Sequence, residues 1–220
     1  MSLKRIAVLV SGGGTNLQAL IDAQRRGDIV NGEIAAVIAS KPDAFALERA
    51  ARAGIPGHVV ARRDYDSNQA MTAALVDKLK RLDIDLVVLA GFMVILTQEM
   101  VRAYPNAILN VHPALIPSFC GAGYYGLHVH EKALEYGVKV SGATVHFVSE
   151  ECDGGPIVLQ KAVAVEENDT PESLQRRIME QAEWVILPKA VSLFCQGRLR
   201  VEGRTVRILK PLNLSKECLQ

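Results

Sequence analysis

The sequence lacks the features that would direct a protein to nucleic acid, to a membrane or to an oxidising compartment. Its 25 lysines and arginines balance 24 aspartates and glutamates, so the formal net charge of +1 gives no overall field to attract DNA or an anionic bilayer. The four cysteines form no C-x-x-C pair, which predicts free thiols in a reducing compartment. The apolar run at residues 6–10 is too short for a signal peptide or a membrane span. We therefore expect a cytoplasmic protein that acts on small molecules, with neither nucleic acid nor membrane as a partner.

Short apolar runs alternate with helix-length segments through the first half of the chain. The runs are at residues 6–10, 34–39, 56–60, 86–90 and 108–112, and the segments with helical spacing are at 15–26, 44–53 and 68–82. Strands that are apolar on both faces and alternate with helices are typical of a parallel sheet covered on both sides. The pattern predicts an α/β fold with a mostly parallel twisted sheet and helices on both faces.

The second half predicts antiparallel strands at 138–147 and 157–165, joined by a turn rich in acid and glycine. Either Asp169 or Thr170 is expected to cap a long helix that bends near Pro188 and stops at Gly197. A hairpin is predicted over 199–209. Since no interdomain linker is visible, we expect one domain over residues 1–210, with lobes at about 1–107 and 108–210, and a tail at 211–220.

A glycine-rich loop, Ser11-Gly-Gly-Gly-Thr-Asn16, joins the first predicted strand to the first predicted helix. Backbone N–H groups at such a turn, aided by the helix dipole, can hold a phosphate group without a basic side chain. The alternative is a tight turn with no ligand. A dinucleotide fingerprint would need a third glycine where Leu17 stands, and no G-K-[ST] of a P-loop follows. The loop therefore favours a monophosphate over NAD or ATP.

The segment Asn110-Val-His-Pro113 ends an apolar strand, and strand alternation puts Asn110 and His112 on the same face. Ligands of open α/β sheets bind beyond the carboxyl ends of the strands. An amide N–H can stabilise the oxyanion of a tetrahedral intermediate, and an imidazole can transfer a proton near neutral pH. The pair therefore suits acyl transfer. The alternative is that Asn110 caps a turn while His112 only packs against Pro113.

A third candidate, Asp153, lies in Cys152-Asp-Gly-Gly-Pro156, where two glycines allow a sharp turn close to a ligand. A carboxylate beside His112 is expected to raise the pKa of the imidazole and to orient it. The alternative is a surface aspartate in an Asx turn.

Two other chemistries are less favoured by the residues. The sequence has no G-x-S-x-G elbow, and nothing marks Cys120 or Cys152 as an activated nucleophile. His112, His128 and His130 lack a paired acidic ligand, so the case for a metal is weak.

Five segments, in this order and at suitable spacing, resemble the folate-dependent formyltransferases. They are Ser11-Gly-Gly-Gly-Thr-Asn-Leu17, Ala90-Gly-Phe-Met93, Leu109-Asn-Val-His-Pro-Ala-Leu-Ile-Pro117, Thr144-Val-His-Phe-Val148 and Asp153-Gly-Gly-Pro-Ile157. The resemblance covers residues 5 to 200. The glycine-loop opening is most similar to the branch of the family that works in purine biosynthesis. It implies a formyltransferase-like fold with a Rossmann-type N-terminal half that binds phosphate and a C-terminal half that binds folate and carries out catalysis.

The resemblance also implies a reaction, in which a formyl group moves from 10-formyltetrahydrofolate to the amine of glycinamide ribonucleotide without a metal. It implies that Asn110 stabilises the oxyanion, that His112 acts as an acid or electrostatic stabiliser, and that Asp153 shuttles protons and tunes His112. The ribonucleotide's phosphate and amine end would be bound by Gly13, Gly14, Thr15, Asn16 and Glu183. The folate would contact Leu89, Met93, Val94, Ile95, Leu96, Asn110, Cys152 and Asp153. We expect a monomer or a weak homodimer.

The chain departs from its relatives in three places. Val94 and Asn68 stand where arginines are common in the family, and Arg62 or Arg63 is a candidate to replace the second of these. The segment 118–126 is longer than the usual loop and contains three glycines and two adjacent tyrosines. It is expected either to be a mobile lid over the folate or to pack its tyrosines down.

Three other functions were weighed. Methionyl-tRNA formyltransferases usually carry a further C-terminal RNA-binding domain, and formyltetrahydrofolate hydrolases a preceding regulatory domain. Neither is expected here, because the first strand begins near residue 5 and the chain is short. A nucleotide-binding module without catalysis would use the glycine loop but leave Asn110, His112 and Asp153 unexplained.

Overall fold

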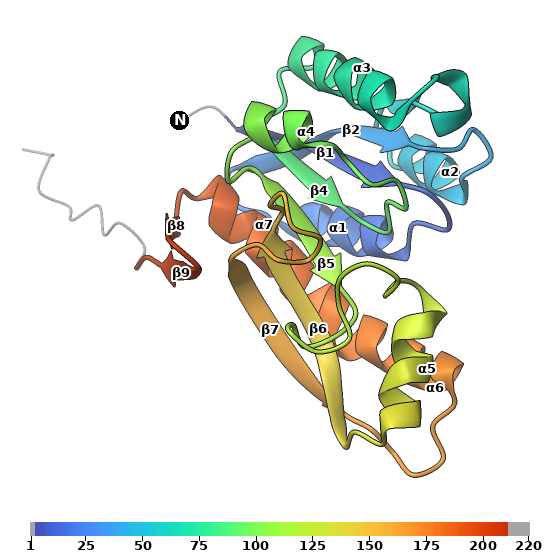
Figure 1. Ribbon diagram of the computed structural model, residues 1–220. Helices are drawn as coiled ribbons and strands as arrows, with labels where there is room; N and C mark the ends of the chain where they lie inside the picture. Colours follow the sequence, from blue (N-terminus) through green and yellow to red (C-terminus); the bar gives the residue numbers. More distant parts are fainter. Residues whose placement is uncertain (1–2, 211–220) are drawn as a thin grey trace, which may run out of the picture.

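A single mixed sheet runs through the molecule (Figure 1). The computed structural model of the protein describes residues 3–210, so the predicted tail at 211–220 lies outside the described residues. The strand order is β3-β2-β1-β4-β5-β6-β7-β9-β8. The strands are β1 (Lys4–Val10), β2 (Gly32–Ala39), β3 (Gly57–Val59), β4 (Leu86–Leu89), β5 (Ile108–His112), β6 (Val140–Phe147), β7 (Ile157–Ala164), β8 (Leu199–Glu202) and β9 (Thr205–Ile208).

The sheet changes direction at β5. Strands β3, β2, β1, β4 and β5 are parallel, whereas β6 is antiparallel to β5 and β7 is antiparallel to β6. Along β1, Ile6 and Val8 enter one hydrophobic core and Ala7 and Leu9 enter the other. Because this strand is apolar on both faces, it needs helices on both sides. The predicted fold class is confirmed.

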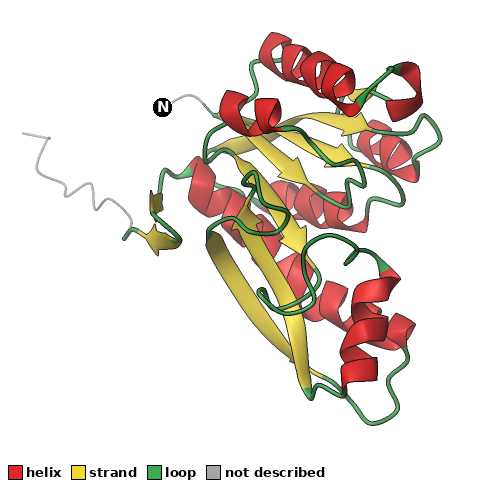
Figure 2. Ribbon diagram, in the orientation of Figure 1, coloured by secondary structure: helices red, strands yellow, loops and turns green. Residues whose placement is uncertain are grey.

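Two layers of helix cover the sheet (Figure 2). The helices are α1 (Thr15–Arg26), α2 (Phe45–Arg52), α3 (Asn68–Arg81), α4 (Gln98–Ala103), α5 (Leu127–Tyr136), α6 (Pro171–Ile178) and α7 (Trp184–Cys195). Helices α1, α2, α6 and α7 pack on one face, and α3 and α4 on the other. The sequence patterns did not predict α4 and α5. None of the described helices has the length and apolar content needed to cross a bilayer.

The predicted long helix is interrupted earlier than expected. A π-helical turn at Met179–Glu183 separates α6 from α7, and Pro188 lies inside α7. Pro188 lacks the N–H that would bond to the carbonyl of Trp184. Since Trp184 is the first residue of α7, that bond would lie at the junction, where the helical ladder is already irregular. The irregular turn thus precedes Pro188, and the bend predicted near Pro188 stays a prediction.

The start of α6 resolves the choice of cap. The Thr170 side chain accepts a hydrogen bond from the N–H of Ser173, and Pro171 occupies the first turn. Asp169 instead pairs with Arg177, at 2.5 and 2.7 Å. Thr170 is therefore the cap, and Asp169 ties the start of the helix to its second turn.

Candidate active site

Asn110 and His112 end β5 at the point where the sheet turns antiparallel. Their partners across β6 are His146 and Thr144, respectively. Asp153 lies in the turn between β6 and β7, with its backbone in the left-handed region at φ 53°. Gly155, two residues later, lies directly against the carbonyl of Phe147, and a Cβ at this position would be 1.8 Å from the carbonyl oxygen. The glycine thus lets this turn fold back over the end of β5.

The carboxylate of Asp153 is the centre of the cluster. His112 Nδ1 lies 3.5 Å from Asp153 Oδ2, and His146 Nε2 lies 3.6 Å from Oδ1. Asn110 Nδ2 makes a long contact of 3.4 Å with the same Oδ1. The N–H of Gly121 donates to Oδ2 at 2.9 Å. The three residues predicted for catalysis are therefore brought together, and the segment 118–126 supplies part of their support.

His146 was not predicted as a site residue, although its segment contributed to the family resemblance. It is 1% exposed, and its Nδ1 bonds to the carbonyl of Phe147 at 3.0 Å. Because a carbonyl only accepts, Nδ1 carries the proton and Nε2 of the neutral ring accepts from Asn110 Nδ2, at 3.1 Å. His146 thereby orients the amide of Asn110. Strand alternation alone could not predict this contact, because it depends on the register that pairs His146 of β6 with Asn110 of β5.

Burial decides the pKa of His112. The ring is 4% exposed, and this desolvation lowers its pKa, while the Asp153 carboxylate and the Phe119 carbonyl act in the opposite direction. The net result is a pKa below the ordinary value of 6.5. The Asp153 carboxylate raises the pKa of His112 as expected, but burial of the ring outweighs it.

Asp153 remains ionised at neutral pH. Burial raises the pKa of its carboxyl, but its contacts with His146, the charge of His112 and the N–H of Gly121 together outweigh burial. The pKa consequently lies below the ordinary value of 3.8. A carboxylate that stays charged in a largely buried place can accept a proton during a reaction.

The glycine loop is held by α2. Gly14, in the left-handed region at φ 72°, precedes α1, and a Cβ there would lie 2.7 Å from Cβ of Ala46. The N–H of Ala46 donates to the carbonyl of Gly12 at 3.1 Å, and Arg49 Nε donates to that of Gly13 at 2.8 Å. Among residues 3–210, no side chain caps α1. The first N–H groups of α1 are therefore available to an anion.

Glu183 connects this loop to the π-helical turn. It is 6% exposed, and its Oε2 accepts from Asn16 Nδ2 at 2.6 Å. Burial raises the pKa of Glu183 to about 7, against the opposing effect of the Asn16 hydrogen bond. Oδ1 of Asn16 is buried and has no hydrogen-bond partner among residues 3–210. Two of the predicted ribonucleotide-binding residues are thus in direct contact.

The predicted folate segment combines packed and exposed side chains. Val94 and Leu96 pack against the core on the α3 face, as does Val148 beside the Asp153 turn. Met93 is 55% exposed and Ile95 is 77% exposed. Leu89 is buried at the end of β4, while Cys152 is exposed. The segment therefore presents apolar side chains to solvent.

Two contacts fix that segment relative to the rest of the site. The backbone N–H of Met93 donates to Ser11 Oγ at 2.8 Å, which joins the segment to the glycine loop. Gln98 Nε2 donates to Glu150 Oε2 at 3.0 Å, which joins it to the turn that carries Asp153. The predicted folate segment therefore lies between the two loops that carry the other predicted site residues.

A cavity of about 510 Å³ lies at the carboxyl ends of β2 and β3. Its cationic lining residues are Lys41, Arg62 and Arg63. Arg62 is fixed, since Nε donates to Asn68 Oδ1 and Nη1 donates to the carbonyl of Tyr65. Arg63 is 75% exposed at its side chain. Asn68 thus holds the guanidinium of Arg62 in place at the edge of this cavity.

The long loop and the remaining histidines have distinct roles in packing. Tyr124 packs on Phe119, whereas Tyr125 is 62% exposed, so one tyrosine is packed down and the other is not. His128 Nδ1 pairs with Glu131 at 3.0 Å, and His130 is buried on α5. Within the described chain, no three histidine, cysteine or acidic side chains are grouped as metal ligands.

The asparagine and histidine at the end of β5 and the aspartate of the β6–β7 turn form a site suited to acyl transfer. The family model described as formyl transferase matches residues 4–191, and the chain belongs to that family. It is 46% identical over 200 residues to a phosphoribosylglycinamide formyltransferase of Haemophilus influenzae, covering 91% of each chain.

Solved structures give the same grouping. The fold matches glycinamide ribonucleotide transformylase 1 from Symbiobacterium toebii with a TM-score of 0.89 and 50% identity, covering 94% of this chain and 95% of that one. It also matches a formyltetrahydrofolate deformylase from Pseudomonas syringae with a TM-score of 0.84 and 26% identity, covering 95% of this chain and 67% of that one. The fold is thus common to transferring and hydrolysing enzymes, with the higher identity on the transferring side.

Proposed function

We propose that the protein transfers the formyl group of 10-formyltetrahydrofolate to the amine of glycinamide ribonucleotide, a step of purine biosynthesis. The observation that carries the proposal is the convergence of Asn110, His112 and Asp153 at the end of β5. The transferase relatives support it, since they match almost the whole length of the chain.

In the proposed reaction the substrate amine attacks the formyl carbon, and the carbonyl oxygen becomes an oxyanion. Asn110 Nδ2 donates to that oxyanion, and His112 stabilises its charge. Asp153 accepts the proton that the attacking nitrogen loses. The same proton is returned to the folate nitrogen as its bond to the formyl carbon breaks, so the enzyme ends in its starting state.

The ribonucleotide's phosphate is proposed to bind the glycine loop, through Gly13, Gly14, Thr15 and Asn16. The uncapped start of α1 supports this, because its N–H groups and dipole favour an anion. Glu183 is proposed to contact the ribonucleotide, for which the sequence resemblance suggested the amine end. Its bond to Asn16 favours a contact close to the glycine loop.

Arg62 is proposed to supply the positive charge that Asn68 does not. Two of its nitrogens are already held by Asn68 and the Tyr65 carbonyl, which leaves Nη2 free to reach a phosphate oxygen from a fixed position. The exposed Arg63 has no comparable restraint, which favours Arg62 of the two candidates.

The folate is proposed to lie against Leu89, residues 93–96, Cys152 and Asp153. The exposed apolar side chains of Met93 and Ile95 support this, because a folate ring system needs an apolar surface beside the reacting groups. The chain is proposed to work as one domain with two lobes joined by the continuous sheet. Its cytoplasmic location and its monomeric or weakly dimeric state stay predictions.

One experiment separates the proposed function from its rivals. Purified protein is mixed with 10-formyltetrahydrofolate, and loss of the formyl group is followed by absorbance with and without glycinamide ribonucleotide. Rapid loss only with the ribonucleotide supports the transferase. Equal loss without it indicates the hydrolysis that the deformylase relative suggests. Binding of the ribonucleotide with no reaction in either mixture would make the chain a binding module.

A further inference from the structure

The backbone of Phe119 adopts a conformation that a bulky residue rarely takes. Its φ is 49°, in the left-handed region. Steric contact of Cβ with the backbone makes this unfavourable for every residue except glycine, and the strain persists only where the surroundings enforce it. Gly121 and Gly123 follow in the same loop with positive φ. The chain therefore accepts strain at Phe119 although it uses glycine for two neighbouring positions.

The strained backbone presents its carbonyl to the candidate active site. His112 Nε2 lies 2.8 Å from the Phe119 carbonyl oxygen. Because this oxygen can only accept, a hydrogen bond at this contact requires the proton on Nε2. The other nitrogen, Nδ1, is the one that faces Asp153 Oδ2 at 3.5 Å.

The hydrogen bond to Phe119 therefore determines how a proton is shared. With Nε2–H fixed, the neutral ring would direct the Nδ1 lone pair at a negatively charged carboxylate, which is repulsive. A proton on Nδ1 removes the repulsion, because it forms an imidazolium–carboxylate pair with Asp153. If His112 lost its hydrogen bond to the Phe119 carbonyl, the proton of the neutral ring could move to Nδ1 and leave Nε2 unprotonated.

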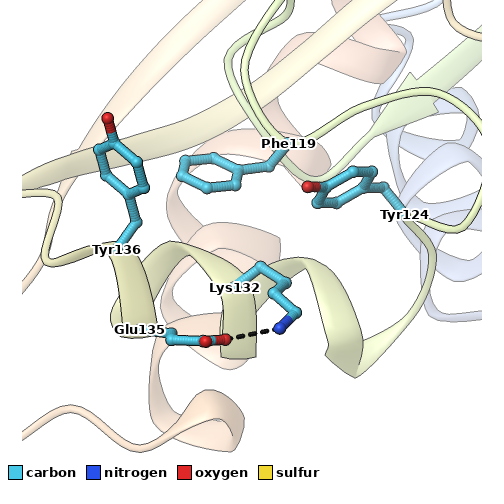
Figure 3. A pocket seen from close by; sticks show the side chains of 5 residues that line it. All are labelled: Phe119, Tyr124, Lys132, Glu135 and Tyr136. Carbon is cyan, nitrogen blue, oxygen red and sulfur yellow. Dashed lines mark hydrogen bonds and ion pairs between the residues drawn. The ribbon is translucent and has the colours of Figure 1, made fainter.

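The ring of Phe119 is held by aromatic packing on the outside of the loop (Figure 3). It lies between Tyr124 of the same loop and Tyr136 at the end of α5, with ring centroids 6.3 and 6.0 Å away in edge-to-face arrangements. These rings line a cavity of about 230 Å³ together with the Lys132–Glu135 ion pair. The anchor thus connects the loop to a regular helix.

We propose that Phe119 is a positioning residue for His112. Tyr124 and Tyr136 anchor its ring, which keeps the Phe119 carbonyl hydrogen-bonded to His112 Nε2. The other nitrogen of His112, Nδ1, is then left to exchange a proton with Asp153. The proposal deepens the proposed formyl transfer and rests on it for its kinetic consequence. The same loop holds the other partner, since the N–H of Gly121 donates to Asp153.

Other titratable groups surround His112 and must be kept constant in a test. His146 of β6 and Asp153 of the β6–β7 turn face the ring, and His130 of α5 lies close enough to influence it. Cys120 adjoins Phe119 in the loop, and burial and the charge of Asp153 raise the pKa of its thiol. None of these groups is altered by a change of the Phe119 side chain.

The test compares Phe119→Ala with Tyr125→Ala. Tyr125 belongs to the same loop, but the Phe119 ring packs on Tyr124 and Tyr136, so removal of Tyr125 costs a large aromatic side chain without touching the anchor. Phe119→Ala is expected to lower kcat about tenfold or more, because a general acid loses its orientation. KM values should stay within about twofold, since neither ring is proposed to contact a substrate. Tyr125→Ala should keep kcat within about twofold, and Phe119→Tyr should restore the wild-type rate.

A spectroscopic readout separates positioning from simple loss of structure. Nitrogen-15 NMR of the histidine rings distinguishes the two tautomers, and wild-type His112 should show only Nε2–H at high pH. Phe119→Ala should show a mixture of tautomers, with the other histidines unchanged. A single Nε2–H tautomer and a normal kcat in Phe119→Ala would overturn the proposal. If that variant does not fold, Tyr136→Ala loosens the ring from α5, and a normal kcat and tautomer there would also overturn it.

The two proposals can fail separately. Absence of formyl transfer in the wild-type protein would remove the proposed function, while the NMR comparison would still decide whether Phe119 sets the tautomer. Normal transfer with an unchanged tautomer in Phe119→Ala would remove only the role of Phe119.

Discussion

His112 Nδ1 and Asp153 Oδ2 lie 3.5 Å apart, with side chains only 5% and 10% exposed. At this distance and burial the two groups share their proton equilibria, so any titration seen in the reaction belongs to the cluster. The acid–base chemistry proposed for the site depends on this pair.

Replacement of Asp153 by asparagine should reduce turnover strongly. The amide keeps the shape of the side chain but cannot accept the proton of the attacking amine, so kcat should fall by about 10²- to 10⁴-fold. Binding of the ribonucleotide, measured by calorimetry, should change by less than about threefold, because its proposed phosphate site on α1 is a separate part of the chain. Turnover close to that of the wild-type protein would remove Asp153 from the catalytic centre.

The rate should decline in acid, because proton uptake by the His112–Asp153 pair leaves no acceptor for the proton of the attacking amine. Burial lowers the pKa of His112 below its ordinary value of 6.5. NMR titration of His112 in Asp153→Asn adds a sign check. The carboxylate raises the pKa of His112, so its removal should move the midpoint to still lower pH. A kcat that stays constant from mild acid to neutrality, or an upward shift in the variant, would contradict the pairing.

Arg49 offers a test of the phosphate loop. Its Nε donates to the carbonyl of Gly13, and its Nη1 donates to Oε1 of Gln18 at 3.1 Å. Arg49→Met should let the loop relax, and the KM of the ribonucleotide should rise about tenfold, equivalent to ~1.4 kcal/mol, with the KM of the folate unchanged.

Arg52→Met is the matched control for that change. Arg52 also lies over the Phe45 ring, at 5.5 Å against 5.1 Å for Arg49, but bonds only to Glu48 and is 70% exposed. Its replacement should leave both KM values as they are. An equal effect of the two variants would mean that charge near α2, and not the bond to Gly13, governs binding.

The parts of the fold that follow a short-range period could be predicted from the sequence. Strand alternation was enough to put Asn110 and His112 on one face, and the apolar runs gave the parallel sheet. Helix α5 was not predicted, because it follows a glycine-rich loop and no side chain caps its start. Elements that an apolar run or a helix cap indicates were predicted. Elements that depend on tertiary packing alone were not.

Long-range pairings account for the rest of the site. Asn16 and Glu183 are 167 positions apart, and His146 faces Asn110 only because of the register between β5 and β6. The net shift of the pKa of His112 could not be predicted either, since the sequence reveals a neighbouring carboxylate but not how deeply the ring is buried. Burial, which is a property of the packed chain, outweighed the charge interaction that the pattern had indicated.

Glu183 gives a prediction on stability that follows from its buried carboxyl. Burial raises its pKa from 4.5 to about 7 in the folded protein. Below the pKa of Glu183 in the unfolded chain, the carboxyl is protonated in both the folded and the unfolded state and does not reduce stability. As the pH rises through the folded value, the folded state must either keep a proton or bury a charge, and stability is lost. A pKa difference of this size corresponds to about 3 kcal/mol.

Glu183→Gln removes this pH dependence while an amide oxygen can still accept from Asn16. Relative to the wild-type protein, the variant should therefore gain free energy of unfolding between pH 4.5 and pH 8, by up to about 3 kcal/mol in denaturant titrations. Glu180→Gln, an exposed neighbour in the same π-helical turn, should show no such gain. A difference that is constant with pH would mean that the Glu183 carboxyl titrates near its unfolded value, with water or a cation reaching it through the turn.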